Sequence, residues 1–297
     1  MGLGPDDPGT NPLAAAEFPV LRSLMGGARP VLDADGRFVT SGPGWAARAI
    51  DANLGVSGLP QSGTGQTALL TGENAPELYG RHFGPWVPTG LQELLGERNL
   101  FRRLRSLGGS AAFANAAPGG RDGAQKRATR RPGAFPFATL AADVLIRDET
   151  DLREGRALAS SITTDEWRAS IDPRAPEITP AEAGKNLAHI SRENRFTAFA
   201  HWNTDYIGHR GGMTDALMIL SRVDEFLGGV ITHFNSDALL VVTSDHGNLE
   251  DLSTTMHTRN PIPLLAFGPS AHWFCGQVEN LSGFVPAVLE LLGLEDR

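Results

Sequence analysis

Carboxylate or imidazole side chains of interest occur at three places in the last third of the sequence. Asp205 and His209 are four residues apart in "NTDYIGHR", and on a helical turn this spacing puts two side chains on one face. Asp245 and His246 are adjacent in "VVTSDHGN", and His257 follows in "MHTRNPIP". These residue types suit zinc or manganese. Each motif alone has an ordinary explanation, such as a helix cap for the aspartate or a surface position for the histidine. Their combination in a chain with eight histidines predicts a metal centre.

A serine in a glycine-rich turn is the candidate nucleophile. Ser62 lies in "GLPQSGTGQTALLTGENAP", directly before a helical pattern. At a helix N-terminus, backbone N–H groups and the helix dipole stabilise negative charge. The alternative is that this serine is an ordinary N-cap, which is the commoner role for serine at such a position.

Short apolar runs and helical patterns alternate around these residues. Residues 238–244 ("ALLVVTS") and 262–268 ("IPLLAFG") have the length and composition of buried strands. Residues 214–234 have apolar side chains at helical spacing, with Gly228 and Gly229 as a weak point. The alternation predicts an α/β fold with a doubly wound, mostly parallel sheet. Such sheets bind ligands at the carboxyl ends of their strands, which is where the adjacent Asp-His pair stands.

The middle of the chain has a different character. It contains helical pieces and a basic stretch, and one helix is expected to begin after Thr179, which is followed by proline and then by a glutamate at the third helical position. We interpret residues 81–196 as an inserted cap or substrate region, and residues 1–80 with 197–297 as the sheet domain.

Two features near or within this region are candidates for substrate contact. His82 follows closely on the turn that carries the serine, although a structural role explains it as well. Arginine forms bidentate pairs with phosphate and carboxylate groups, so Arg121, Arg130 and Arg131 are candidates for gripping a substrate. These arginines belong to a basic run of Arg121, Lys126, Arg127, Arg130 and Arg131. The composition of this run favours the other explanation, that it is a face exposed to solvent.

The bulk composition excludes several classes of protein. The net charge is -8, from 26 basic and 34 acidic residues, which argues against a nucleic-acid-binding protein. The single cysteine, Cys275, excludes an internal disulfide and fits a reducing compartment. No membrane-spanning stretch and no signal-peptide layout are present in the sequence as given. We therefore expect a cytoplasmic protein without a membrane or nucleic-acid partner.

Taken together, the motifs resemble the alkaline phosphatase superfamily, and in particular its cofactor-independent phosphoglycerate mutase branch. The stretch "SDHGNLEDLSTTMHTRNPIPLL" is similar to the C-terminal signature of that branch. "DYIGH" is similar to its Asp-x-x-Gly-His motif, and "QSGTGQTALLTG" to the turn that carries its serine nucleophile. The order of these motifs along the chain also agrees. The resemblance covers roughly the first 80 and the last 100 residues.

The resemblance implies an α/β/α sandwich with an inserted cap, and two divalent metal ions, manganese or zinc. Its ligand side chains form two sets, one of Asp205, His209 and His257 and one of Asp245, His246 and Ser62. An aspartate from the first strand would complete the second set. The serine would attack a small phosphorylated metabolite and form phosphoserine. Transfer onward to a hydroxyl of the retained product makes a phosphomutase, and transfer to water makes a phosphatase; both stay open.

The chain departs from this pattern at its start. Family members open with an apolar strand that ends in Asp-Gly and supplies an aspartate ligand, whereas this sequence begins "MGLGPDDPGT". We expect that the first strand is missing because the sequence as given starts late, and that Asp6 and Asp7 belong to the following loop. The alternative is a real truncation, which would make the chain a catalytically impaired or inactive metal-binding relative. A sulfatase is disfavoured, because "SGTGQ" lacks the Cys/Ser-x-Pro/Ala-x-Arg setting of a formylglycine residue.

Overall fold

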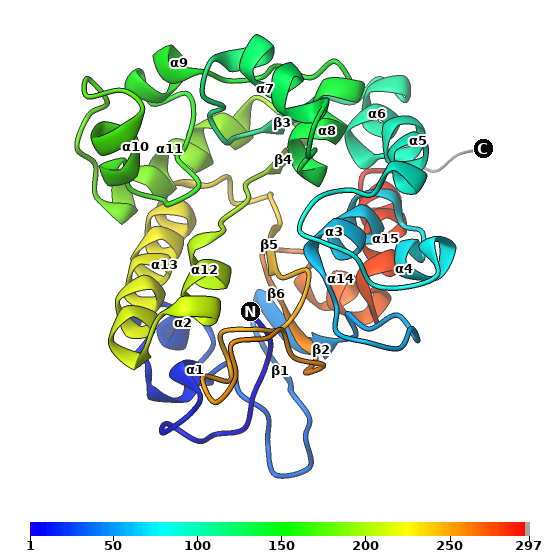
Figure 1. Ribbon diagram of the computed structural model, residues 1–297. Helices are drawn as coiled ribbons and strands as arrows, with labels where there is room; N and C mark the ends of the chain where they lie inside the picture. Colours follow the sequence, from blue (N-terminus) through cyan, green and yellow to red (C-terminus); the bar gives the residue numbers. More distant parts are fainter. Residues whose placement is uncertain (295–297) are drawn as a thin grey trace. The chain divides into compact units, whose positions relative to one another are not determined.

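The computed structural model of the chain describes residues 1–294, and these form two compact units (Figure 1). Unit 1 consists of Met1–Pro85, Asn203–Asp224 and the chain from Ser236 onward. Unit 2 consists of Trp86–Trp202 and Glu225–Asn235. The expected functional division into a sheet domain and an inserted cap stays a prediction.

A four-stranded sheet forms the framework of unit 1, with the strand order β1-β2-β6-β5. All six residues of β6 are buried, as expected for the uniformly apolar run "IPLLAF" between two neighbouring strands. The strands expected at 238–244 and 262–268 are confirmed as β5 and β6. The four strands are β1 (Val39–Gly42), β2 (Trp45–Ile50), β5 (Leu240–Thr243) and β6 (Ile262–Phe267).

The direction of these strands differs from the expectation of a mostly parallel sheet. β2 and β5 each pair antiparallel with β6, and β1 pairs antiparallel with β2. Among the strands that the structure describes, the parallel pair is β3 (Ala111–Phe113) with β4 (Phe196–Ala198) in unit 2. A strand buried on both faces carries the same apolar side chains in either direction, so its composition predicts burial but not direction. The predicted α/β class is confirmed, and the predicted mostly parallel pairing was wrong for this sheet.

Helices lie on both sides of the sheet of unit 1 (Figure 1). In the first group of helices, α14 packs on β2 and β6, and α15 packs against α14 and α3. Phe274 of α14 and Val285 of α15 are fully buried there, and burial of side chains of this size contributes about 1.5–3 kcal/mol each. The first group is α3 (Ser62–Thr71), α4 (Ala75–Tyr79), α14 (Ala271–Gln277) and α15 (Phe284–Leu291). The second is α1 (Pro12–Ala15), α2 (Pro19–Leu24) and α12 (Asn203–Arg210).

The longest helix, α13 (Met213–His233), is continuous through the glycine pair that was expected to weaken it. Within unit 2, a β-carbon on Gly229 would lie 2.1 Å from the carbonyl oxygen of Ala181 in α11 (Pro180–Arg192). A β-carbon on Gly184 would lie 2.2 Å from the carbonyl oxygen of Phe226. These glycines therefore allow α11 and α13 to pack backbone against backbone. α11 also begins at the expected N-cap, Thr179, in a complete capping box.

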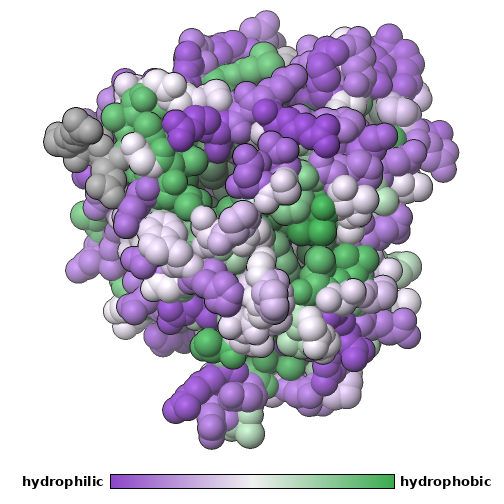
Figure 2. Space-filling view, turned by 180° about the vertical axis from the view of Figure 1, so that it is seen from behind, coloured by the Kyte–Doolittle hydropathy of each residue, from purple (hydrophilic) through white to green (hydrophobic). Residues whose placement is uncertain are grey.

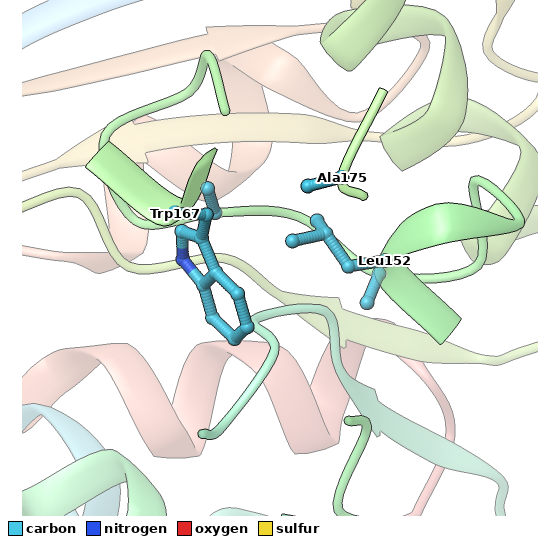
Figure 3. Close-up of a cluster of buried hydrophobic side chains, with 5 residues drawn as sticks. Leu152, Trp167 and Ala175 are labelled. Carbon is cyan, nitrogen blue, oxygen red and sulfur yellow. The ribbon is translucent and has the colours of Figure 1, made fainter. Parts of the chain in front are cut away.

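Unit 2 consists of short helices around the β3–β4 pair. A small hydrophobic cluster ties its loops together: the buried indole of Trp167 lies beside Leu152 and Ala175 (Figure 3). A second group of aromatic rings surrounds β3, where Phe113 stacks on Phe135 at 5.5 Å between ring centroids. The remaining helices are α5 (Thr89–Arg98), α6 (Leu100–Ser106), α7 (Gly120–Ala128), α8 (Ala134–Ala141), α9 (Glu149–Arg153) and α10 (Asp165–Ser170).

Hydrophilic side chains alternate with separate hydrophobic patches on the face drawn in Figure 2. Within residues 1–294, the structure contains no helix with the length and apolar character needed to cross a membrane.

Candidate metal centre and nucleophile

Three elements of unit 1 bring the predicted residues together. α12 carries Asp205 and His209 on one face, with 3.5 Å between Oδ1 of the aspartate and Nε2 of the histidine, as their spacing predicts. The segment between β5 and β6 carries Asp245, His246 and His257. The N-terminus of α3 carries the serine.

The first group of ligand atoms is compact. Oδ1 of Asp205 lies 3.4 Å from Nε2 of His257, and the ligand atoms of Asp205, His209 and His257 all lie within 4.8 Å of one another. Donor atoms about 2.0–2.2 Å from one cation stand roughly 2.9–3.5 Å apart, depending on the coordination angle. The separations among these three side chains therefore match a shared divalent cation.

The hydrogen bonds of His209 and His257 determine which imidazole nitrogen faces the space between the three ligand side chains. Nδ1 of His257 lies 2.6 Å from the carbonyl oxygen of Pro60, and Nδ1 of His209 lies 2.7 Å from that of Thr255. A carbonyl oxygen only accepts, so each Nδ1 donates, and in a neutral imidazole Nε2 then keeps a lone pair. The two Nε2 atoms face each other at 3.0 Å. Two lone pairs at this distance repel unless a proton or a metal ion lies between them.

Oδ1 of Asp205 supports the same interpretation. This atom is buried and has no hydrogen-bond partner among the described residues, which is costly for a carboxylate oxygen unless a cation binds it. Burial alone would raise the pKa of Asp205, but positive charge on the neighbouring imidazoles, that of His257 foremost, would lower the pKa to about 2, which shows how strongly this carboxylate favours positive charge at this position. The carboxylate is therefore ionised at neutral pH, and the chemistry of the donor set fits a divalent cation.

The serine lies next to this group. Ser62 is the first residue of α3, and Gln61 is the N-cap, so the explanation of Ser62 as an N-cap is wrong. Its Oγ is 2.8 Å from Nε2 of His246. The imidazole of His246 stacks on that of His257, with 3.8 Å between ring centroids. Burial lowers the pKa of His246, which favours the neutral form that both a metal ligand and a proton acceptor require.

Asp245 also lies close to the imidazole of His246. Its Oδ2 is 3.6 Å from Nε2 of His246 and accepts a hydrogen bond of 2.8 Å from Nε2 of Gln66. Gln66 stands one helical turn after the serine in α3, so the helix that presents the hydroxyl also orients this carboxylate.

Glycines allow α3 and α12 to lie close to the segment that follows β5. A β-carbon on Gly65 of α3 would lie 2.7 Å from the carbonyl oxygen of Asp245, too close for any other residue without movement. Gly208 of α12 occupies an equivalent position against Asn248. Gly65 of "SGTGQ" and Gly208 of "DYIGH" therefore mark the contacts through which α3 and α12 reach the segment after β5.

Several residues that orient the site were not singled out from the sequence. They are the carbonyl groups of Pro60 and Thr255 and the amide side chains of Gln66 and Asn248. Helical spacing from the serine was a usable signal for Gln66. The two carbonyl groups carry no side-chain signal at all.

The roles of the candidate substrate-binding residues stay predictions. His82 is partly buried in unit 1, where its Nε2 is 3.3 Å from the carbonyl oxygen of Val56, and burial lowers its pKa. In unit 2, Arg121 pairs with Asp143 at 3.0 Å. Arg131 places its guanidinium over Trp86, 4.6 Å from the ring centroid, and Arg130 is exposed in the turn after α7.

Comparison with known proteins identifies related metalloenzymes. Residues 175–296 match the model of the Metalloenzyme superfamily. A 2,3-bisphosphoglycerate-independent phosphoglycerate mutase from Thermomicrobium roseum is 29% identical over 160 residues, which cover 50% of this chain and 30% of that relative. The corresponding enzyme from Halobacterium salinarum is 32% identical over 193 residues, 55% of this chain and 38% of the relative. A phosphopentomutase from Syntrophotalea carbinolica is 34% identical over 115 residues, 37% and 29% of the two chains.

The relatives are matched over only part of their length, and a solved structure is similar in fold. The matched region spans less than two fifths of the length of these curated relatives. The structure of alkaline phosphatase from the Antarctic bacterium TAB5 superimposes with a TM-score of 0.50 at 12% identity, over 84% of this chain and 89% of that one; at this identity it shows the fold alone. The chain is therefore similar, over residues 175–296, to the Metalloenzyme superfamily and, over about half of its length, to the 2,3-bisphosphoglycerate-independent phosphoglycerate mutases, and it has a fold like that of alkaline phosphatase.

Proposed function

We propose that this chain is a phosphoryl-transfer enzyme that uses Ser62 as its nucleophile beside two divalent metal ions. One ion would be held by Asp205, His209 and His257, and the other by Asp245, His246 and Ser62. The substrate would be a small phosphorylated metabolite, since the curated relatives are mutases of phosphoglycerate and phosphopentose.

One observation carries the metal-dependent part of this proposal. The Nε2 atoms of His209 and His257 face each other at 3.0 Å, beside the buried and unpartnered Oδ1 of Asp205. Manganese and zinc both accept this donor set. When bound, such ions lower the pKa of a coordinated hydroxyl and stabilise negative charge on phosphoryl oxygens.

The protein's own residues would perform the transfer in two steps. The oxygen of Ser62 attacks phosphorus while the bond to the substrate oxygen breaks, and the serine becomes phosphoserine. The N-terminus of α3 favours the negative charge at this position. The phosphoryl group then passes to another hydroxyl of the retained product, which is mutase chemistry, or to water, which is phosphatase chemistry.

The decisive experiment compares metal-free and reloaded full-length chain on 3-phosphoglycerate and on p-nitrophenyl phosphate. We expect turnover only after Mn²⁺ or Zn²⁺ is restored, and we expect mass spectrometry of acid-quenched reactions to find the phosphoryl group on Ser62. Ser62→Ala should lower turnover by at least about 10³-fold. Ser106→Ala is the matched control, because that hydroxyl is exposed and bonds only to the backbone of its own helix in the described contacts.

Two results would count against the proposal. Full activity in Ser62→Ala would remove the serine as nucleophile. Near-stoichiometric metal without turnover on either ester would favour the alternative, a metal-binding relative that has lost catalysis.

A further inference from the structure

The carboxylate of Glu250 is buried within the segment that joins β5 to β6, with 1% of the residue exposed. This segment carries His246 near its start and His257 near its end. A buried carboxylate needs several donors to offset the loss of water, and its donors here are informative.

Four donors converge on the two oxygens of this side chain. Oε2 accepts the backbone N–H of Gly2 at 2.5 Å and that of Asn248 at 2.8 Å. Oε1 accepts the hydroxyl of Thr258 and Nδ2 of Asn260 at 3.2 Å.

The segment between β5 and β6 has two arms, one that contains His246 and one that contains His257. The partners of Glu250 lie on both arms. Asn248 is two residues after His246, and Thr258 directly follows His257. The arms also meet through the backbone, since the N–H of Thr258 donates to the carbonyl oxygen of Gly247 at 3.1 Å. The carboxylate therefore fixes how far apart the two arms, and hence the two imidazoles, are held.

We propose that Glu250 is a positioning residue of the metal centre: by joining the two arms, its carboxylate holds His246 and His257 in place for metal binding. The proposal rests on the metal-dependent function proposed above. Glu250 itself supplies no ligand in this scheme; it acts through the backbone and side chains that it accepts hydrogen bonds from.

The pattern of donors also explains why the residue must be a carboxylate. A glutamine has the same shape but replaces one oxygen with an NH₂ group. Each oxygen of Glu250 accepts from two donors. A glutamine NH₂ group at the Oε2 position would face two backbone N–H groups and lose both hydrogen bonds. At the Oε1 position it could donate to the hydroxyl of Thr258, which also accepts, but it would lose the hydrogen bond from Nδ2 of Asn260. Glu250→Gln is therefore a nearly isosteric change that removes at least one hydrogen bond of this contact.

The test measures metal binding by the full chain, independently of turnover. Glu250→Gln and the matched control Glu93→Gln, which alters an exposed glutamate, are titrated with Mn²⁺ and Zn²⁺ against a competing chelator, and the Co²⁺-loaded proteins are compared by absorption spectroscopy. We expect the affinity of Glu250→Gln to fall about 10- to 100-fold, as is typical when partners of metal ligands are removed, with an altered cobalt spectrum. Glu93→Gln should match the wild type in both measurements.

The thermal stability of the metal-free proteins separates positioning from general support of the fold. Unchanged metal affinity and an unchanged cobalt spectrum in Glu250→Gln, whether or not its melting temperature falls, would overturn the inference. If Glu250→Gln does not fold, Thr258→Val removes one of the four donors, and wild-type affinity in that variant would overturn the inference as well. Failure of the wild-type chain to bind metal is a distinct result that would remove the proposed function itself.

Discussion

Gly208 of α12 packs directly against the side chain of Asn248, so closely that a β-carbon on the glycine would lie 1.3 Å from Oδ1 of the asparagine. Asn248 is fully buried, and its Nδ2 lies 3.4 Å from Nδ1 of His209. The helix that carries two of the three side chains of the first ligand group thus packs against a residue that lies two positions after His246.

Gly208→Ala should therefore disturb the metal centre. The methyl group must push α12 or Asn248 away, which we expect to cost about 1–3 kcal/mol of stability and to lower metal affinity at least tenfold. Gly212→Ala is the matched control, because a β-carbon at Gly212 meets nothing within 4 Å. Thermal unfolding and metal titration check both variants, and wild-type affinity in Gly208→Ala would show that this contact does not set the ligand geometry.

Asp205→Asn keeps the size of the side chain and removes its charge. Because the carboxylate is held ionised with a pKa of about 2, the wild type presents a full negative charge at neutral pH. We expect metal affinity to fall by at least about 100-fold, more than for loss of an orienting partner. Equilibrium dialysis with metal analysis measures the change, with Asp237→Asn at an exposed position as control. Equal metal content in the two variants would remove Asp205 from the site.

Asp172 of unit 2 gives a prediction about pH. The hydrogen bond from Arg174 lowers the pKa of Asp172 to about 2 against the effect of burial, and Arg153 adds to the lowering. A carboxylate whose pKa is depressed on folding stabilises the protein above its ordinary pKa of about 3.8 and loses this contribution as pH falls toward 2. Asp172→Asn should be less stable than the wild type at pH 6, with a smaller difference at pH 3. A difference in unfolding midpoint that does not change with pH would point to packing rather than charge.

Two glycine-to-alanine changes in helices should have opposite effects on stability. Gly229→Ala inserts a methyl group 2.1 Å from the carbonyl oxygen of Ala181, and we expect destabilisation by about 1–3 kcal/mol. Gly276→Ala in α14 meets nothing within 4 Å, and it should stabilise by about 0.5–1 kcal/mol because alanine favours helix. Chemical denaturation checks both. Stabilisation by Gly229→Ala would contradict the close packing of α11 and α13.

The sequence was informative where side-chain type or spacing decides the outcome. The i, i+4 pair in α12, the start of α11 after Thr179 and the two strands on either side of the ligand segment followed from local patterns. The direction of β5 did not, because a short apolar strand carries the same side chains in a parallel and in an antiparallel pair. Glu250 was also beyond sequence reasoning, since two of its four donors are backbone N–H groups that any residue would supply. Gly229 was misread as a weakness because helix propensity does not report the neighbour against which a glycine packs.

The sharing of α13 between the units has a consequence for how the protein is made. Residues 86–202 leave the ribosome before residues 225–235, so α11 must wait for the second half of α13 before the backbone contact at Gly184 can form. Unit 1 is completed later still, because β5 and β6 are translated after residue 235. A nascent chain stalled before residue 225 would therefore expose surfaces that the finished molecule covers.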